Sequence, residues 1–482
     1  MSVKEEAIGG VKWNGVGTVI VAAMQLLKLF IMARFLTKSE FGLLALTTMV
    51  LGFTEIFANM GLATGLIHKQ NITREQYSSV FWLNLMLSMA VYGILCALTP
   101  LVAMYYKEPD LQKLIPLAGL QLVITSFGKL FYTFKTKELD FKFITIVNVI
   151  GALVGVGSTV MLAVCGQGVY SMVYGTLIQY TLVQAIYSVM GIKRYKILFH
   201  FKLSEISDLL KIGGYQLGMQ VIDYVAAKTD VFLIGRFFGT ELLGVYNLAK
   251  DLVLKVVQVI NPIVTSVAAP AFAKFQDDKP RMRDSYCRIL KILSFLNVPV
   301  FAVLFVFADP LTVLFYGSEK FDVALYVRIL SLWGFFQSVG NPASILMISL
   351  GRTDLGFYWT LIRVFFTIVI TYISCMFNIL QILAYAQVLL AFVFLFAYWR
   401  MMVFKMIQLP LTKYLASISF ALLASLISAV ISAVLLSFVH NDVLQLLLLF
   451  FFASVYFAIY LLFQRRFVKE MICYLIKRNH TL

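Results

Sequence analysis

The sequence predicts an all-α polytopic membrane protein with about 14 transmembrane helices, arranged as two parallel six-helix repeats and a C-terminal helix pair. Three observations support this fold class: the composition, the spacing of the apolar segments and an internal repeat. The 482 residues are 61% hydrophobic and 13% charged, whereas soluble domains are roughly 45–50% apolar and about 25% charged. Apolar runs of about 20 residues recur along the chain, and each can cross a bilayer core of about 30 Å as a helix.

The internal repeat has an offset of 202 residues. In the first copy Arg34 closes one apolar run and Gly42, eight residues later, opens the next; Arg236 and Gly244 do the same in the second copy. Because an even number of spans separates the copies, both enter the membrane from the same side, which makes the repeat parallel. Repeats of this kind are typical of secondary transporters, whose substrate site lies between the repeats.

The predicted spans, in chain order, are 11–36, 41–66, 78–105, 114–134, 144–164, 169–190, 209–235, 241–271, 286–307, 324–350, 355–377, 380–403, 412–438 and 443–464. The basic stretch around residues 191–207 divides spans one to six from spans seven to twelve. We therefore expect an N-lobe at 1–195 and a C-lobe at 196–408. Residues 409–482 hold spans thirteen and fourteen and a basic tail at the cytoplasmic surface.

The net charge of +16 is explained by topology. When the loops are assigned to alternate sides, the side with both termini holds about 27 Lys and Arg residues, and the other side about seven. This bias follows the positive-inside rule and predicts that both termini are cytoplasmic. The same distribution argues against nucleic acid as a partner.

Polar residues inside the predicted spans are the candidate functional groups, because charge in a bilayer is costly and marks aqueous cavities. Span one carries Asn14, Thr18, Gln25 and Lys28 at helical spacing, on one face. The 202-residue offset aligns them with Gln216, Gln220, Ala227 and Asp230. Both repeats thus direct a polar stripe the same way, and Lys28 corresponds to Asp230.

Spans two and eight add further polar groups: Glu55, Asn59, Asn247, Lys250, Asp251, Lys255, Gln258 and Asn261. In spans one, two, seven and eight the cations are Lys28, Arg34, Lys228, Arg236, Lys250 and Lys255, and the anions are Glu55, Asp223, Asp230 and Asp251. The predicted cavity is therefore cationic and favours an anionic substrate such as a pyrophosphate. Nearby amides could bind sugar hydroxyls.

Structural roles compete with this interpretation. Arg34 and Arg236 end their spans, where snorkelling to headgroups explains them equally well. Lys129 and Arg363 are expected to be headgroup anchors near span ends. Walker A, GxSxG and HExxH motifs are absent, and no metal-ligand spacing is found. We therefore expect neither an enzyme nor a cofactor or metal.

Three features together resemble the polysaccharide transporter (Wzx-type) flippases of the multidrug/oligosaccharidyl-lipid/polysaccharide exporter superfamily. They are the Arg-Phe-x6-Gly motif after spans one and seven, the basic stretch before span seven, and Lys-Glu-Leu-Asp-Phe-Lys at residues 137–142. The resemblance implies a MATE-like fold with two lobes and a cationic cavity, and a lipid-tail groove at spans thirteen and fourteen.

The same resemblance implies a bacterial inner-membrane protein that moves undecaprenyl-pyrophosphate-linked oligosaccharide from the cytoplasmic to the outer leaflet. Its expected partners are that substrate, membrane lipids, the polymerase and chain-length proteins of the pathway, and a coupling ion, H⁺ or Na⁺. The basic residues of the cavity set match the spans that contribute basic residues in the family.

Two other hypotheses stay open. A cation-coupled drug antiporter of the same superfamily would use Asp223, Asp230 or Glu55 as its coupling carboxylate, but should have twelve spans and an acidic cavity. A membrane glycosyltransferase or polysaccharide polymerase would be equally hydrophobic, but should carry a large outer loop or a catalytic carboxylate cluster.

Overall fold

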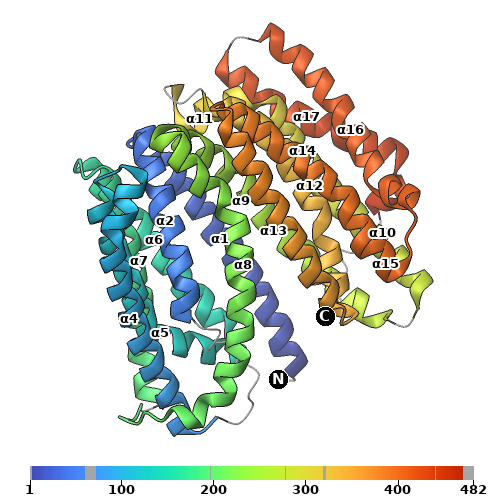
Figure 1. Ribbon diagram of the computed structural model, residues 1–482. Coiled ribbons are helices and arrows are strands. Elements are labelled where there is room, and N and C mark those ends of the chain that lie inside the picture. The colour runs from blue at the N-terminus through green and yellow to red at the C-terminus, as the bar shows by residue number, and fades with distance from the viewer. Residues whose placement is uncertain are drawn as a thin grey trace. The chain divides into compact units, whose positions relative to one another are not determined.

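A computed structural model describes residues 3–59, 72–195, 197–276, 278–318, 322–439 and 441–469, and these residues form helices and connecting turns (Figure 1). Eleven helices of this described part are long and apolar enough to cross a membrane. The chain is thus a multi-pass, all-α membrane protein. Contacts divide it into two compact units, Met1–Gly244 and Val245–Leu482.

The first unit contains α1 (Val3–Met32), α2 (Lys38–Asn59), α4 (Arg74–Tyr106), α5 (Leu111–Lys137), α6 (Phe141–Val164), α7 (Val169–Tyr195), the 3₁₀ helix η1 (Leu203–Ile206), α8 (Ser207–Phe237) and the start of α9 (Gly239–Lys274). Within it α6 packs on α1 and α7, and α5 packs on α4 and α7. Helix α8 packs on α2.

The second unit contains the rest of α9, α10 (Lys279–Val306), α11 (Ala308–Tyr316), α12 (Val323–Ser349), α13 (Thr353–Met376), α14 (Leu380–Tyr398), the π-helix η3 (Trp399–Val403), α15 (Phe404–Ile407), α16 (Leu411–Phe438) and α17 (Asp442–Phe463). Helix α10 packs on α12 and α16, α14 on α12 and α13, and α16 on α17.

Every predicted span overlaps a helix of the structure. Local chemistry explains where several begin: Thr73 and Gln76 form a capping box at α4, and Asp140 and Asp278 accept hydrogen bonds from the first-turn N–H groups of α6 and α10. The short helix α11 lies between the spans predicted at 286–307 and 324–350. The count of fourteen spans and the two six-helix repeats stay predictions. Residues 60–66 of the second predicted span lie outside the described residues.

The basic connection between α7 and α8 is attached to the N-terminal end of α4. The backbone N–H groups of Leu198 and Lys202 donate to the hydroxyls of Ser78 and Ser79 at 3.0 and 3.1 Å. The indole of Trp82 donates to the carbonyl of Leu198 at 2.9 Å. These contacts hold the connection in the first unit; the lobe boundary predicted at residue 195 stays a prediction.

The turn from α5 to α6 holds the end of α7 through an ion-pair network. The Glu138 carboxylate accepts a hydrogen bond from the Tyr195 hydroxyl at 2.6 Å and forms a salt bridge with Arg194 at 2.9 Å. Lys135 pairs with Glu138 at 3.3 Å and with Asp140 at 2.8 Å. Burial raises the pKa of Asp140, but hydrogen bonds from Lys135 and the chain N–H, and the charges of Lys135 and Arg194, outweigh it, so this pKa lies below its usual value.

The two glycines of the internal repeat, Gly42 and Gly244, each lie against the first residues of the helix that carries the other. A Cβ on Gly42 would lie 2.6 Å from the carbonyl carbon of Thr240, and one on Gly244 would lie 2.8 Å from that of Lys38. The 202-residue offset of the repeat aligns Lys38 with Thr240 and Gly42 with Gly244. Each glycine therefore contacts the residue equivalent to the one that its counterpart contacts. Such reciprocity is what a two-fold relation between similar elements produces. The Ser39 and Thr240 hydroxyls also hydrogen-bond at 2.9 Å.

Candidate functional site

A cluster of polar side chains lies among the helices of the first unit. Lys28 of α1 donates to the Thr176 hydroxyl of α7 at 3.1 Å. Glu55 of α2 accepts a short hydrogen bond from the Gln121 amide of α5. Lys129, two turns further along α5, interacts electrostatically with Glu55. The polar groups therefore form two sets, Lys28 with Thr176 between α1 and α7, and Glu55 with Gln121 and Lys129 between α2 and α5.

Two tyrosines extend the cluster to α7 and α8. Tyr180 and Tyr224 both lie close enough to Glu55 for its charge to act on their hydroxyls. The Tyr224 hydroxyl donates to the Met49 carbonyl at 2.7 Å, where α2 and α8 pack together. Gly52 leaves room for this ring, since a Cβ there would lie 2.9 Å from ring carbons of Tyr224.

Buried charge of this kind is stable only when it is compensated. An ionised group at the centre of a membrane helix costs about 2.5–3.5 kcal/mol on insertion scales, and an opposite charge or a hydrogen bond reduces that cost. Glu55 and Lys129 meet this condition together. Lys28 instead bonds a neutral hydroxyl, and its ammonium has three donors in all. The chemistry of Lys28 thus suits an exchangeable anion, and that of Glu55 suits an internal charge partner.

The other predicted residues of this unit lie in different environments. Asp230 is 5% exposed, and its carboxylate accepts a hydrogen bond from the N–H of Val231 at 2.9 Å. Gln25 and Asp223 are exposed, and Gln220 and Lys228 are half-buried. The side chains of Asn14, Asn59 and Gln216 lie outside the described residues.

The two repeat arginines lie at exposed positions. Arg236, in the last turn of α8, donates to the Tyr105 carbonyl at 3.0 Å, and its guanidinium lies 5.0 Å from the centre of the Tyr105 ring. Arg34 follows the end of α1 and is exposed. This geometry is compatible with headgroup contact and with a place at the rim of a cavity.

The predicted residues of span eight lie on α9 in the second unit. Lys250 is 8% exposed, and its ammonium lies 5.7 Å from the centre of the Trp333 ring. Asp251 accepts a hydrogen bond from the Asn247 amide at 3.1 Å. Asn261 accepts one from Asn297 of α10 at 3.3 Å. Lys255 is half-buried.

Two cations expected to be headgroup anchors have other surroundings in the structure. Lys129 faces Glu55, as described above. Arg363 lies ten residues after the first residue of α13, which has 24 residues, so it is near the middle of the helix and not at its end. That expectation was therefore wrong for Arg363. Its neighbours come from the preceding and following helices, α12 and α14, which spacing along α13 alone does not reveal. In the part of the chain that the structure describes, no group of three or more His, Cys, Asp or Glu side chains could hold a metal ion.

The sequence model of one family, described as polysaccharide biosynthesis protein, matches residues 31–325, more than half of the chain. The chain belongs to this family. The resemblance drawn from the sequence is thereby confirmed.

Relatives in several bacteria carry related descriptions. The chain is 27% identical over 365 residues to the lipopolysaccharide biosynthesis protein WzxC of Escherichia coli K12, which covers 76% of this chain and 74% of that protein. It is 26% identical over 358 residues to the teichuronic acid biosynthesis protein TuaB of Bacillus subtilis 168, covering 74% of each. With the succinoglycan biosynthesis transport protein ExoT of Rhizobium meliloti it shares 24% identity over 448 residues, covering 90% and 88%.

Solved structures share the fold at low identity. The lipid II flippase MurJ, in an inward closed conformation, superimposes with a TM-score of 0.80 over 94% of this chain and 99% of that protein, at 15% identity. An inward-facing multidrug transporter of the MATE family of the MOP superfamily gives a TM-score of 0.61, over 80% and 98%, at 16% identity. The predicted MATE-like fold class is thus confirmed.

Proposed function

We propose that the protein is a flippase that moves undecaprenyl-pyrophosphate-linked oligosaccharide repeat units from the cytoplasmic to the outer leaflet of a bacterial inner membrane. The observation that carries the proposal is family membership together with a fold shared with a lipid flippase over nearly the whole chain. Both termini would be cytoplasmic, as the distribution of Lys and Arg favours.

The chemistry of the polar cluster suits a pyrophosphate ligand. A lysine that hydrogen-bonds a neutral hydroxyl, as Lys28 does, can exchange that partner for a phosphate oxygen and gain a charge-assisted bond. Lys228 on α8 and Lys250 on α9 would supply further positive charge, and the predicted amides would bind sugar hydroxyls. The protein moves its substrate without bond chemistry, so it acts as a transporter and not as an enzyme.

Alternating access would carry the substrate, with the two lobes opening to each side in turn. Glu55 would couple this motion to an ion. Protonation of Glu55 would remove the charge that compensates Lys129 in the membrane, so the cluster would favour a different arrangement of α2 and α5 in each protonation state. The polymerase and chain-length proteins of the same pathway would receive the flipped product.

The first test is lipid extraction from a strain that lacks this gene. Accumulation of the complete lipid-linked repeat unit, with loss of the surface polymer, is the expected result. Complementation with Lys28→Ala should fail, whereas Lys113→Ala, which removes an exposed lysine of the first unit, should restore the polymer. Normal polymer with an unchanged lipid-linked pool would contradict the proposal, provided that no second flippase is encoded.

A cation-coupled antiporter is the second candidate, and the buried carboxylate of Glu55 favours it. It predicts that purified protein in vesicles exchanges organic cations for protons. If that exchange fails and the lipid-linked intermediate accumulates in the deletion strain, the flippase is the only one of the two candidate functions that remains.

A further inference from the structure

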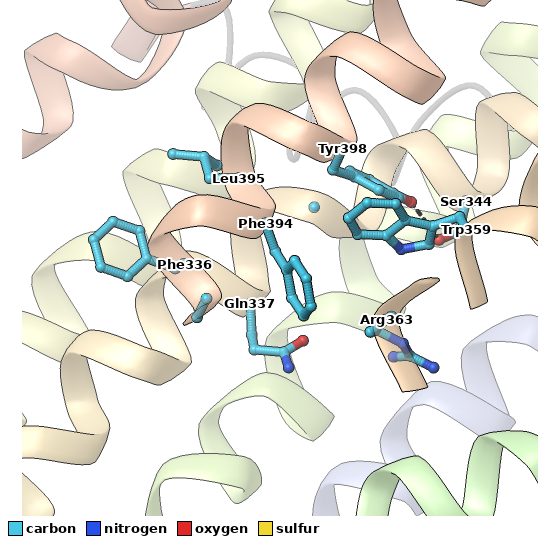
Figure 2. A pocket seen from close by; sticks show the side chains of 10 residues that line it. Phe336, Gln337, Ser344, Trp359, Arg363, Phe394, Leu395 and Tyr398 are labelled. Carbon is cyan, nitrogen blue, oxygen red and sulfur yellow. Dashed lines mark hydrogen bonds between the residues drawn. The ribbon is translucent and has the colours of Figure 1, made fainter. Parts of the chain in front are cut away.

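A groove in the second unit is lined by residues that the cationic cavity does not include. Helices α12 and α13 both pack against α14 and contact each other much less. The space between them holds a cavity of about 120 Å³, lined among others by Gln337, Ser344, Trp359, Arg363, Phe394 and Tyr398 (Figure 2). Its walls come from α12 and α13 and its floor from α14.

The groove combines one charge with neutral polar groups and aromatic rings. Among the described residues that line it, Arg363 alone carries a charge. The Ser344 and Tyr398 hydroxyls hydrogen-bond at 3.0 Å, and Arg363 interacts electrostatically with Tyr398. The Trp359 ring centre lies 5.4 Å from that of Phe394 and 5.0 Å from that of Tyr398. Ligand sites typically have this composition: mostly apolar walls with a few convergent polar groups.

The position of Arg363 indicates a role other than headgroup anchoring. Ten residues of helix correspond to about 15 Å, half of a bilayer core of about 30 Å, so Arg363 lies near mid-depth in α13. Arginine at that depth is expensive and usually faces a functional cavity.

The helix that forms the floor is distorted at the same place. The π-helix Trp399–Val403 starts directly after Tyr398, and π-helical turns inside α-helices occur frequently at functional sites. The distortion therefore begins directly after Tyr398, which lines the cavity, and both features mark this end of α14.

We propose that this groove is a sugar-recognition site for a carboxylate-bearing sugar, a uronate, in the transported repeat unit; this rests on the proposed flippase function. The Arg363 guanidinium would pair with the carboxylate, the Gln337 amide would bind ring hydroxyls, and Trp359 would cover the apolar face of the ring. The cavity has room for one such sugar edge and not for an oligosaccharide.

Charge and shape favour a uronate over the two other groups of the substrate. A carboxylate carries one negative charge and accepts the two parallel bonds that a guanidinium fork donates. A pyrophosphate carries more charge than one arginine neutralises in this groove. A neutral hexose offers the guanidinium neither an opposite charge nor a parallel pair of carboxylate oxygens, so it gains less from Arg363 than a uronate does.

The test is ligand binding by the full-length protein in nanodiscs, followed by saturation-transfer NMR titration. The probes are methyl β-D-glucuronide, methyl β-D-glucoside and inorganic phosphate. We expect the wild type to prefer the glucuronide to the glucoside by about tenfold, and Arg363→Gln to abolish that preference while binding of the glucoside is retained. Arg363→Lys keeps the positive charge but loses the paired N–H donors of the guanidinium, so it should show an intermediate preference for the glucuronide. Arg352→Gln is the matched control, because Arg352 precedes the same helix, is exposed and pairs with Asp354 at 2.9 Å.

Four outcomes would overturn the proposal. These are equal binding of both glycosides, a preference that survives in Arg363→Gln, an equal loss in the Arg352 control, and phosphate binding more tightly than the glucuronide in an Arg363-dependent way. If Arg363→Gln does not fold, the preference of the wild type for the glucuronide and its reduction in Arg363→Lys still test the proposal. The flippase function is tested separately in proteoliposomes with a neutral and a uronate-bearing lipid-linked oligosaccharide. Failure of the wild type to flip either substrate would count against the flippase and leave the binding result standing.

Discussion

Replacing Gly42 with alanine should destabilise the contact between the starts of α2 and α9. An added Cβ would lie 2.6 Å from the carbonyl carbon of Thr240 and 2.8 Å from its Cα, whereas ordinary contact begins at 3.4 Å. The carbonyl oxygen of Thr240 would lie closer still, so the two backbones must separate by more than about 1 Å. All of these contacts are to backbone atoms, so no flexible side chain can move away instead. Overpacking of this kind costs about 1–3 kcal/mol.

Thermal unfolding of the purified protein in detergent measures this cost. We expect the midpoint of Gly42→Ala to fall by about 2–8 °C, read from tryptophan fluorescence. Gly93→Ala is the matched control, because Gly93 lies in α4 with no neighbouring atom within 4 Å of an added Cβ. That change should leave the midpoint unchanged or raise it slightly, since alanine favours a helix over glycine by about 1 kcal/mol.

The double variant distinguishes a shared contact from two separate ones. Gly244 has the reciprocal contact with Lys38, where a Cβ would lie 2.8 Å from the carbonyl carbon. Once the helix ends have separated for one Cβ, the second needs little further movement, so the Gly42→Ala and Gly244→Ala effects should not add. An unfolding midpoint for Gly42→Ala equal to that of the wild type would refute the reasoning.

Three further predictions concern the same unit. Cysteines at Ser39 and Thr240, whose hydroxyl oxygens are 2.9 Å apart, should form a disulfide in a background without native cysteines and stop transport until a reductant is added; transport that continues after complete oxidation would mean that this contact need not open. Glu55→Gln should flatten the pH dependence of transport, measured in proteoliposomes, because it removes the carboxylate that titrates beside Lys129; an unchanged pH profile would exclude Glu55 as the coupling group. Because the pKa of Asp140 is lower in the folded state, its contribution to stability is present above the pKa of the unfolded chain and is lost as the pH falls through the folded value. Asp140→Asn should lower the unfolding midpoint by about 1–2 °C at pH 7 and by less at pH 3, and an equal loss at both pH values would contradict the ion-pair account.

The sequence predicted the helices well because the bilayer imposes their length. Apolar runs of about 20 residues must become helices, since a membrane offers no other partner for backbone N–H and C=O groups. Helix α11 was not predicted, because its nine residues are too few to span a membrane. The Arg34 and Gly42 spacing was recognised as a repeat from the sequence alone; the structure adds why the glycine is there, because Thr240 occupies the place of its side chain.

The candidate site was less predictable, because its contacts join residues far apart in the chain. The spacing of polar residues identified Lys28 and Glu55, but their partners Thr176 and Gln121 lie 148 and 66 residues away. Nothing in the local pattern of α5 or α7 selects these partners. Arg363 was misjudged for a different reason: the predicted span 355–377 already placed it inside the helix, and only its neighbours on α12 and α14 required the structure.

The two half-buried lysines of the first unit, Lys28 and Lys129, suit different parts of a transport cycle. A substrate anion must bind and then leave, so its cation should not depend on a fixed counter-charge within the protein. Lys28 meets this requirement because its partner, the Thr176 hydroxyl, is neutral and can be replaced by a phosphate oxygen without leaving a charge behind. Lys129 does not, because an anion that replaced Glu55 would leave that carboxylate buried beside a second negative charge. Substrate binding at Lys28 and charge compensation at Glu55 are therefore separable, and a change at one should leave the chemistry of the other intact.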